Sequence, residues 1–170
     1  MMIPAEYDEI RPYTASEIPQ ICEELIADPE FQAIIKYVIK DIPFEYIAQQ
    51  MRASKDNLEF QKTLIYPFMK GLLQKLSSGL TVSIENKESM AKSLCISNHR
   101  DIIMDSALLD MVFVENIGNT VEIAIGDNLL IYPWIKTLVR MNKAFTVRRS
   151  LKAKEMMESS ILMSRYMHYA

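Results

Sequence analysis

The sequence predicts an α/β protein in which an all-helical N-terminal segment precedes a helix-flanked, mainly parallel sheet. Three observations support this class. Apolar residues recur at helical spacing up to about residue 76, runs typical of strands begin at Leu80, and strand and helix patterns then alternate. Such alternation favours a parallel sheet covered by helices. We therefore expect a helical segment over residues 1–78 and the N-terminal part of an α/β domain over residues 79–170.

Helix start and stop signals divide the N-terminal segment. Thr14 and Glu17 resemble a capping box, and Asp28 followed by proline is typical of the first turn of another helix. A longer apolar stripe predicts a helix that Pro67 kinks. The predicted helices cover residues 14–27, 29–40, 44–51 and 56–76.

The second half has a different pattern. Residues 80–84 alternate apolar and polar side chains, and residues 93–97 form a short apolar run, so both are expected to be strands. Four strands are few for a sheet of this kind, so we expect the α/β domain to be C-terminally incomplete. The predicted strands cover residues 80–84, 93–97, 120–125 and 144–147, and the predicted helices cover residues 101–114, 129–141 and 151–169.

Length and composition indicate one domain in the cytoplasm. A chain of 170 residues with 49% apolar content can bury one hydrophobic core. No apolar run approaches the roughly 20 residues that cross a bilayer, and residues 1–7 lack the features of a secretory signal. Because Cys22 and Cys95 have no metal-ligand spacing, we expect both to be buried and predict no metal site.

Charge is unevenly distributed although the net charge is only -3. Residues 1–60 hold twelve acidic and five basic residues, whereas residues 128–154 hold seven basic residues and no acid. A basic cluster can attract phosphate or an anionic membrane face, although a solvated surface has the same composition.

One histidine lies where an α/β sheet usually binds its ligand. His99 follows a predicted strand and precedes a predicted helix, outside the carboxyl end of the strand. With Asp101 and Asp105 nearby, its imidazole can act as a general base whose tautomer a carboxylate fixes. The alternative is a polar loop in which Asp101 caps the helix and His99 faces water. Spacing alone leaves both interpretations open.

Two segments carry a resemblance to a known family. Residues 96–109, ISNHRDIIMDSALL, resemble the first motif, Asn-His-x4-Asp, of the glycerol-3-phosphate and lysophosphatidate acyltransferase family. Residues 142–148, NKAFTVR, resemble its second motif, Gly-x-x-Phe-Ile-x-Arg. With residues 123–135 between them, the similarity covers most of the chain and resembles a bacterial branch with a helical N-terminal region. It implies an α/β domain of the glycerolipid acyltransferase type.

The resemblance implies an enzyme of phospholipid synthesis that transfers an acyl group from coenzyme A or acyl carrier protein to a hydroxyl of a glycerol phosphate or lysophospholipid. Beyond this thioester co-substrate it implies no cofactor, and no nucleic-acid partner is expected. His99 is then the general base, an aspartate orients it, and Arg148 holds the acceptor phosphate through planar, bidentate donors. Arg149 and Lys143 extend this anion site by charge alone.

Three departures from the family pattern affect the site. Position 104 holds methionine, so the nearest downstream carboxylate, Asp105, lies one residue too far, about 100° around a helix. Either the turn after His99 is longer and Asp105 reaches it, or Asp101 is the partner. Asn142 replaces the second motif's glycine and tolerates left-handed angles. The third motif, containing Glu-Gly, is absent, so we expect these residues to be the front part of a longer enzyme and inactive alone.

Other features leave alternatives open. Trp134 is either an anchor for peripheral contact with the inner face of the membrane or a core residue. The two competing functional classes are a non-catalytic module that binds anionic lipid or phosphate and a helical interaction domain in residues 1–78.

Overall fold

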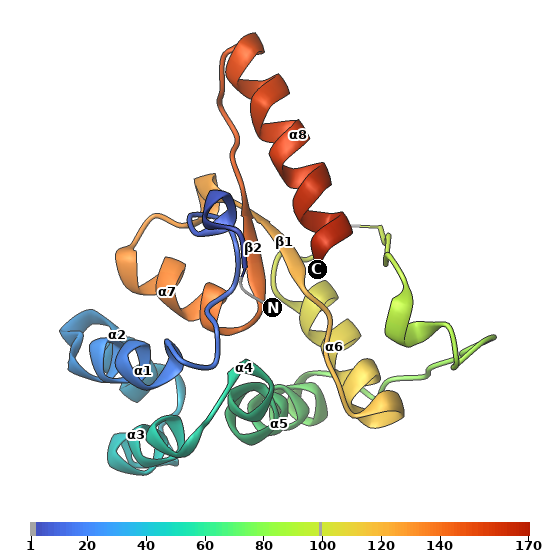
Figure 1. The fold of residues 1–170 in the computed structure, drawn as a ribbon. Helices are drawn as coiled ribbons and strands as arrows, with labels where there is room; N and C mark the ends of the chain where they lie inside the picture. Colours follow the sequence, from blue (N-terminus) through green and yellow to red (C-terminus); the bar gives the residue numbers. More distant parts are fainter. Residues whose placement is uncertain (1–2, 99) are drawn as a thin grey trace.

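The computed structural model describes residues 3–98 and 100–170 and has a mostly helical α/β fold (Figure 1). The sheet that these residues form has two parallel strands, β1 (Ile123–Gly126) and β2 (Ala144–Val147). The predicted mixed class with parallel pairing is confirmed in this reduced form. The helices are α1 (Ile18–Ala27), α2 (Pro29–Val38), α3 (Phe44–Ala53), α4 (Asn57–Phe60), α5 (Tyr66–Leu76), α6 (Met104–Ile117), α7 (Pro133–Met141) and α8 (Ala153–Tyr169), with 3-10 turns at Ala5–Tyr7, Met90–Lys92 and Asp127–Leu129.

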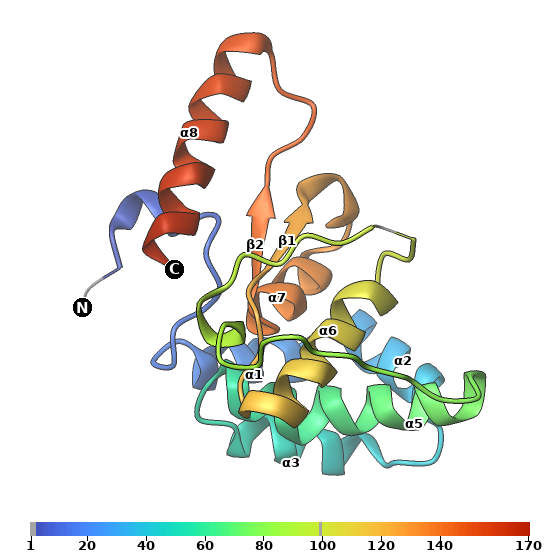
Figure 2. The ribbon, with the colours of Figure 1, turned by 90° about the vertical axis from the view of Figure 1, so that its right-hand side faces the viewer.

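The elements form two groups on either side of the short sheet. Helices α1, α3 and α5 lie below the sheet in both views, whereas α8 projects from the opposite end (Figures 1 and 2). Helix α7 makes the crossover between β1 and β2, as a parallel pair requires. The carboxyl ends of both strands therefore point toward the end of the molecule from which α8 projects.

The first two helices begin for different local reasons. At α2 the Asp28 side chain accepts a hydrogen bond from the Phe31 amide at 2.9 Å, and proline follows at the first helical position, as predicted. Helix α1 begins at Ile18 instead of the predicted residue 14. The Glu17 carboxylate accepts hydrogen bonds from Thr14 and from the Arg11 guanidinium, which lowers the pKa of Glu17 to about 2.

The long helix predicted over residues 56–76 is divided. A π turn at Gln61–Ile65 separates α4 from α5, and Pro67 lies in the first turn of α5. Proline has no amide hydrogen, and its ring clashes with the carbonyl four residues earlier in a regular helix. The wider turn accommodates both effects, so the expected kink appears as a π turn.

Two of the four predicted strands are wrong. Residues 80–84 and 93–97 have no strand assignment, and the side chains of Leu94 and Ile96 are 74% and 88% exposed. An alternating pattern favours extended backbone, but a strand also needs a partner and side-chain contacts on one face. Neither segment has such a partner among the described residues, so the sheet has two strands. Cys95, expected to be buried, is exposed for the same reason, whereas Cys22 is buried as predicted.

The main hydrophobic core joins the N-terminal helices to α7. Trp134 of α7 packs against this core, with its ring centroid 6.0 Å from that of Phe31 in α2. This placement favours the core interpretation of Trp134 over the membrane anchor. Among the described residues, no helix has the length and apolar character to span a bilayer. The buried members of the core are Ile18, Cys22, Leu25, Ile26, Phe31, Phe44, Ile47, Ala48, Met51, Phe60 and Met141.

A second contact holds residues 8–11, called here the strap, against β2 and α7. The Thr146 amide donates to the Ile10 carbonyl at 2.8 Å. The Arg140 guanidinium donates to the carbonyls of Arg11 at 2.8 Å and Asp8 at 2.7 Å. Arg140 is only 9% exposed, so one member of the basic cluster is an internal structural cation instead of a surface charge.

Candidate functional site

His99, the predicted general base, lies outside the described residues. The residues on each side of it are exposed, and Met104 begins α6 five residues later. Residues 100–103 form a turn between position 99 and the helix. The helix therefore begins three residues later than the predicted residue 101.

Asp105 closes this turn. Its Oδ2 atom accepts hydrogen bonds from the backbone amides of Arg100 at 2.6 Å and Asp101 at 3.0 Å. Asp105 thereby reaches back from the first turn of α6 to the two residues that follow position 99. This longer turn has the form expected if Asp105 serves the histidine despite the extra residue in the motif.

Asp101 interacts mainly with the start of the helix. Its Oδ1 atom accepts hydrogen bonds from the amides of Ile103 at 2.9 Å and Met104 at 2.7 Å. These two amides have no partner within the helix, so Asp101 stabilises the N-terminus of α6. The sequence analysis left open both a capping role and a catalytic role for Asp101, and the contacts described here belong to the first.

The predicted phosphate-binding arginines lie at the carboxyl ends of the strands. Arg148 follows β2, and its half-exposed guanidinium forms an ion pair with Glu9 of the strap. The Arg149 amide donates to Asp127 Oδ1 at 2.9 Å, which ties the end of β2 to the turn after β1. A Cβ atom on Gly126 would lie 3.2 Å from Arg149 Nε, so glycine permits this close approach.

Lys143 lies apart from Arg148 and Arg149. It precedes β2, whereas Arg148 follows it, so roughly 13 Å of strand separates them. Its Nζ atom donates to Asn119 Oδ1 at 3.1 Å. Burial lowers the pKa of Lys143, and the nearby acids Asp110 and Glu122 oppose that shift. The left-handed backbone angle expected at Asn142 occurs at Lys143 instead, with φ of 57°.

Asp110 is a buried carboxylate on α6 that the sequence analysis did not identify. Burial raises the pKa of Asp110 to about 6, although the Val121 amide and Lys143 act in the opposite direction. Its Oδ1 atom accepts from Val121 at 3.1 Å, and Oδ2 accepts from Gln61 of the π turn at 3.3 Å. This polar group joins α6 to the segment that leads into β1.

The raised pKa makes the stability contribution of Asp110 depend on pH. Between pH 3.8, the unfolded value, and about pH 6, the folded state binds more protons than the unfolded state. Stability therefore falls as pH rises through this window and then levels off. We expect the free energy of unfolding of Asp110→Asn, relative to the natural sequence, to increase by up to roughly 3 kcal/mol from pH 4 to pH 7 in urea titrations. The exposed Asp41→Asn is the control, and an equal rise in both variants would contradict the assignment.

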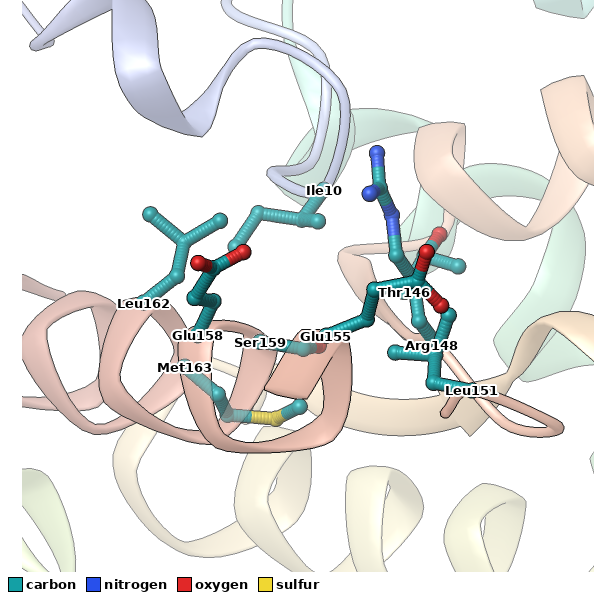
Figure 3. Close-up of a pocket in the computed structure, with 9 residues that line it drawn as sticks. All are labelled: Ile10, Thr146, Arg148, Leu151, Glu155, Glu158, Ser159, Leu162 and Met163. Atoms are coloured by element: carbon teal, nitrogen blue, oxygen red, sulfur yellow. The ribbon is translucent and has the colours of Figure 1, made fainter. Parts of the chain in front are cut away.

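A pocket lies beside Arg148, between the strap, the end of β2 and α8 (Figure 3). Its volume is about 270 Å³. Thr146, 6% exposed, lines the pocket, and its hydroxyl has no hydrogen-bond partner within residues 3–98 and 100–170. Sequence reasoning missed this residue. The available signal was a hydroxyl at the position where the second motif has isoleucine. The lining residues are Ile10, Thr146, Arg148, Leu151, Glu155, Glu158, Ser159, Leu162 and Met163.

The structure brings the predicted site residues into two groups. Asp101 and Asp105 meet at the start of α6, and Arg148 and Arg149 meet at the carboxyl edge of the sheet. In both ribbon views β1 lies between the start of α6 and the loop after β2 (Figures 1 and 2). Within the described part of the chain, no three His, Cys, Asp or Glu side chains converge as metal ligands.

Comparison with known families identifies the class of this domain. Residues 79–168 match the acyltransferase family, and this range covers more than half of the chain and both motif-like segments. The protein therefore belongs to the acyltransferase family, of the glycerol-3-phosphate and lysophosphatidate type. No curated protein and no solved structure matches the chain.

Proposed function

We propose that the protein is an O-acyltransferase of phospholipid synthesis, which transfers an acyl group from a thioester to a hydroxyl of a glycerol phosphate or lysophospholipid. The family match over residues 79–168 is the observation that carries this proposal. The thioester is carried by coenzyme A or acyl carrier protein. We further propose a cytoplasmic protein with peripheral contact at the inner face of the membrane.

The proposed reaction uses His99 as the general base. The imidazole takes the proton of the acceptor hydroxyl as the alkoxide oxygen attacks the thioester carbonyl. Collapse of the tetrahedral intermediate breaks the carbon–sulfur bond, and the proton passes to the departing thiolate. The products are an ester and a free thiol. The bonds from Asp105 to the Arg100 and Asp101 amides support this assignment because they fix the turn that follows the base.

Arg148 is the proposed holder of the acceptor phosphate. Its guanidinium is accessible at the carboxyl end of β2, where ligands of α/β sheets usually bind. Its partner in the structure, the Glu9 carboxylate, shows that the guanidinium can pair with an oxyanion here. A phosphate dianion bound by a bidentate guanidinium is the stronger form of the same interaction.

Replacing Arg148 with Met should weaken acceptor binding by about 10- to 100-fold, because it removes a charge-assisted bidentate contact. The acceptor KM of the full-length protein and the Kd for glycerol 3-phosphate measured by calorimetry test this expectation. Arg165→Met, an exposed arginine on α8, is the matched control. Equal Kd values for the two variants would remove Arg148 from the proposed site.

A further inference from the structure

We propose that the pocket beside Arg148 binds the hydroxyl-bearing end of a polyol phosphate, and that the Thr146 hydroxyl selects for it. This inference rests on the proposed function and names the acceptor class for the same site. A small phosphate monoester with free hydroxyls, such as glycerol phosphate, places its phosphate on Arg148 at the rim and its hydroxyls inside the pocket.

The first argument concerns the Thr146 hydroxyl itself. It is buried, lines the pocket, and makes no hydrogen bond with the described residues. A buried hydroxyl without a partner destabilises a protein, whereas valine fills nearly the same space without that penalty. Packing therefore gives no reason for threonine here. A ligand hydroxyl or phosphate oxygen that reaches the pocket supplies the missing partner.

The second argument concerns the chemistry of the pocket wall. Glu155 and Glu158 line it from α8 together with Ser159, and Figure 3 shows the Glu158 side chain extending toward Ile10 of the strap. Carboxylates accept hydrogen bonds and repel anions. The interior therefore suits hydroxyl donors better than a phosphate group. Apolar side chains complete the wall, and the volume of about 270 Å³ fits a small head group.

The third argument concerns the rim. Arg148 and Glu9 form an exposed ion pair, with side chains 49% and 75% exposed. Pairs of this kind contribute little stability. A phosphate with about two negative charges can displace Glu9, whose carboxylate then moves into solvent. The hydroxyls of the same ligand would extend past Arg148 toward Thr146, two residues earlier on the same face of β2.

The test compares glycerol 3-phosphate with propyl phosphate, which has the same phosphate and carbon chain but no hydroxyl. Calorimetry on the full-length protein should show at least about fivefold tighter binding of glycerol 3-phosphate. In Thr146→Val this preference should fall to within about twofold. The same variant should have a higher Tm, because it removes an unpaired buried hydroxyl. Thr137→Val, an exposed threonine whose hydroxyl bonds the Pro133 carbonyl, should leave the preference unchanged.

Each other outcome rejects a specific statement. If the natural sequence binds both ligands equally and Arg148→Met weakens both, the Thr146 proposal is wrong and the role of Arg148 stands. If neither ligand binds, both proposals are wrong. A lower Tm in Thr146→Val, with the preference retained, assigns Thr146 a purely structural role and also rejects the inference.

Discussion

Replacing Asp105 with Asn should lower acyl transfer by about two to four orders of magnitude, close to the loss expected for His99→Ala. In the proposed reaction a carboxylate must hold the imidazole in one tautomer and stabilise the imidazolium. Asp105 also accepts the amides of Arg100 and Asp101, so its loss releases the turn after the base. Asparagine has one acceptor oxygen and no charge, and it cannot replace both functions.

Asp101→Asn is the matched comparison for this measurement. Asp101 accepts two amides at the start of α6, so we expect its variant to lose about 1 kcal/mol of stability and less than about tenfold in turnover. Turnover is measured with an acyl thioester and glycerol phosphate on the full-length protein, and circular dichroism checks that each variant is folded. A larger loss in Asp101→Asn than in Asp105→Asn would reverse the assignment of the two aspartates.

Replacing Arg140 with Met should lower the free energy of unfolding by about 3 kcal/mol. The guanidinium is buried, donates to two strap carbonyls, and lies 4.4 Å from the centroid of the Tyr13 ring. Methionine keeps much of the volume but leaves the carbonyls of Asp8 and Arg11 without this donor. Urea unfolding at neutral pH measures the difference.

The exposed pair between Arg52 and Glu23 is the control for Arg140. Both side chains are at least 50% exposed, so Arg52→Met should change stability by less than about 1 kcal/mol. If Arg52→Met and Arg140→Met lose equal stability, the strap contacts do not hold the N-terminus as described.

Local signals in the sequence predicted local structure well. The cap at Asp28 appears as expected because a side chain and an amide three residues away decide it. The pattern at residues 93–97 predicted a strand and was wrong, because a strand depends on a partner distant in sequence. The burial of Arg140 was also missed. Its partners lie in the strap, and composition alone classed it with surface charges.

The candidate site could be predicted only in part. Motif spacing identified the segment around position 99, and the structure adds which backbone amides Asp101 and Asp105 bind. Charge alone grouped Lys143 with Arg148, but the strand between them places their side chains at opposite ends of β2. Thr146 required the structure, because only burial without a hydrogen-bond partner distinguishes its hydroxyl from ordinary packing.

The strap sets an order for assembly of the chain. Arg11 and Arg140 are separated by 129 residues, so this contact closes nearly the whole polypeptide into one loop. During synthesis the N-terminus emerges first and has no β2 to bind until almost all of the chain is made. Closing so long a loop is entropically unfavourable and slows folding. The helices around Phe31 and Met51 can pack early, whereas the wall that the strap gives to the Arg148 pocket forms among the last contacts.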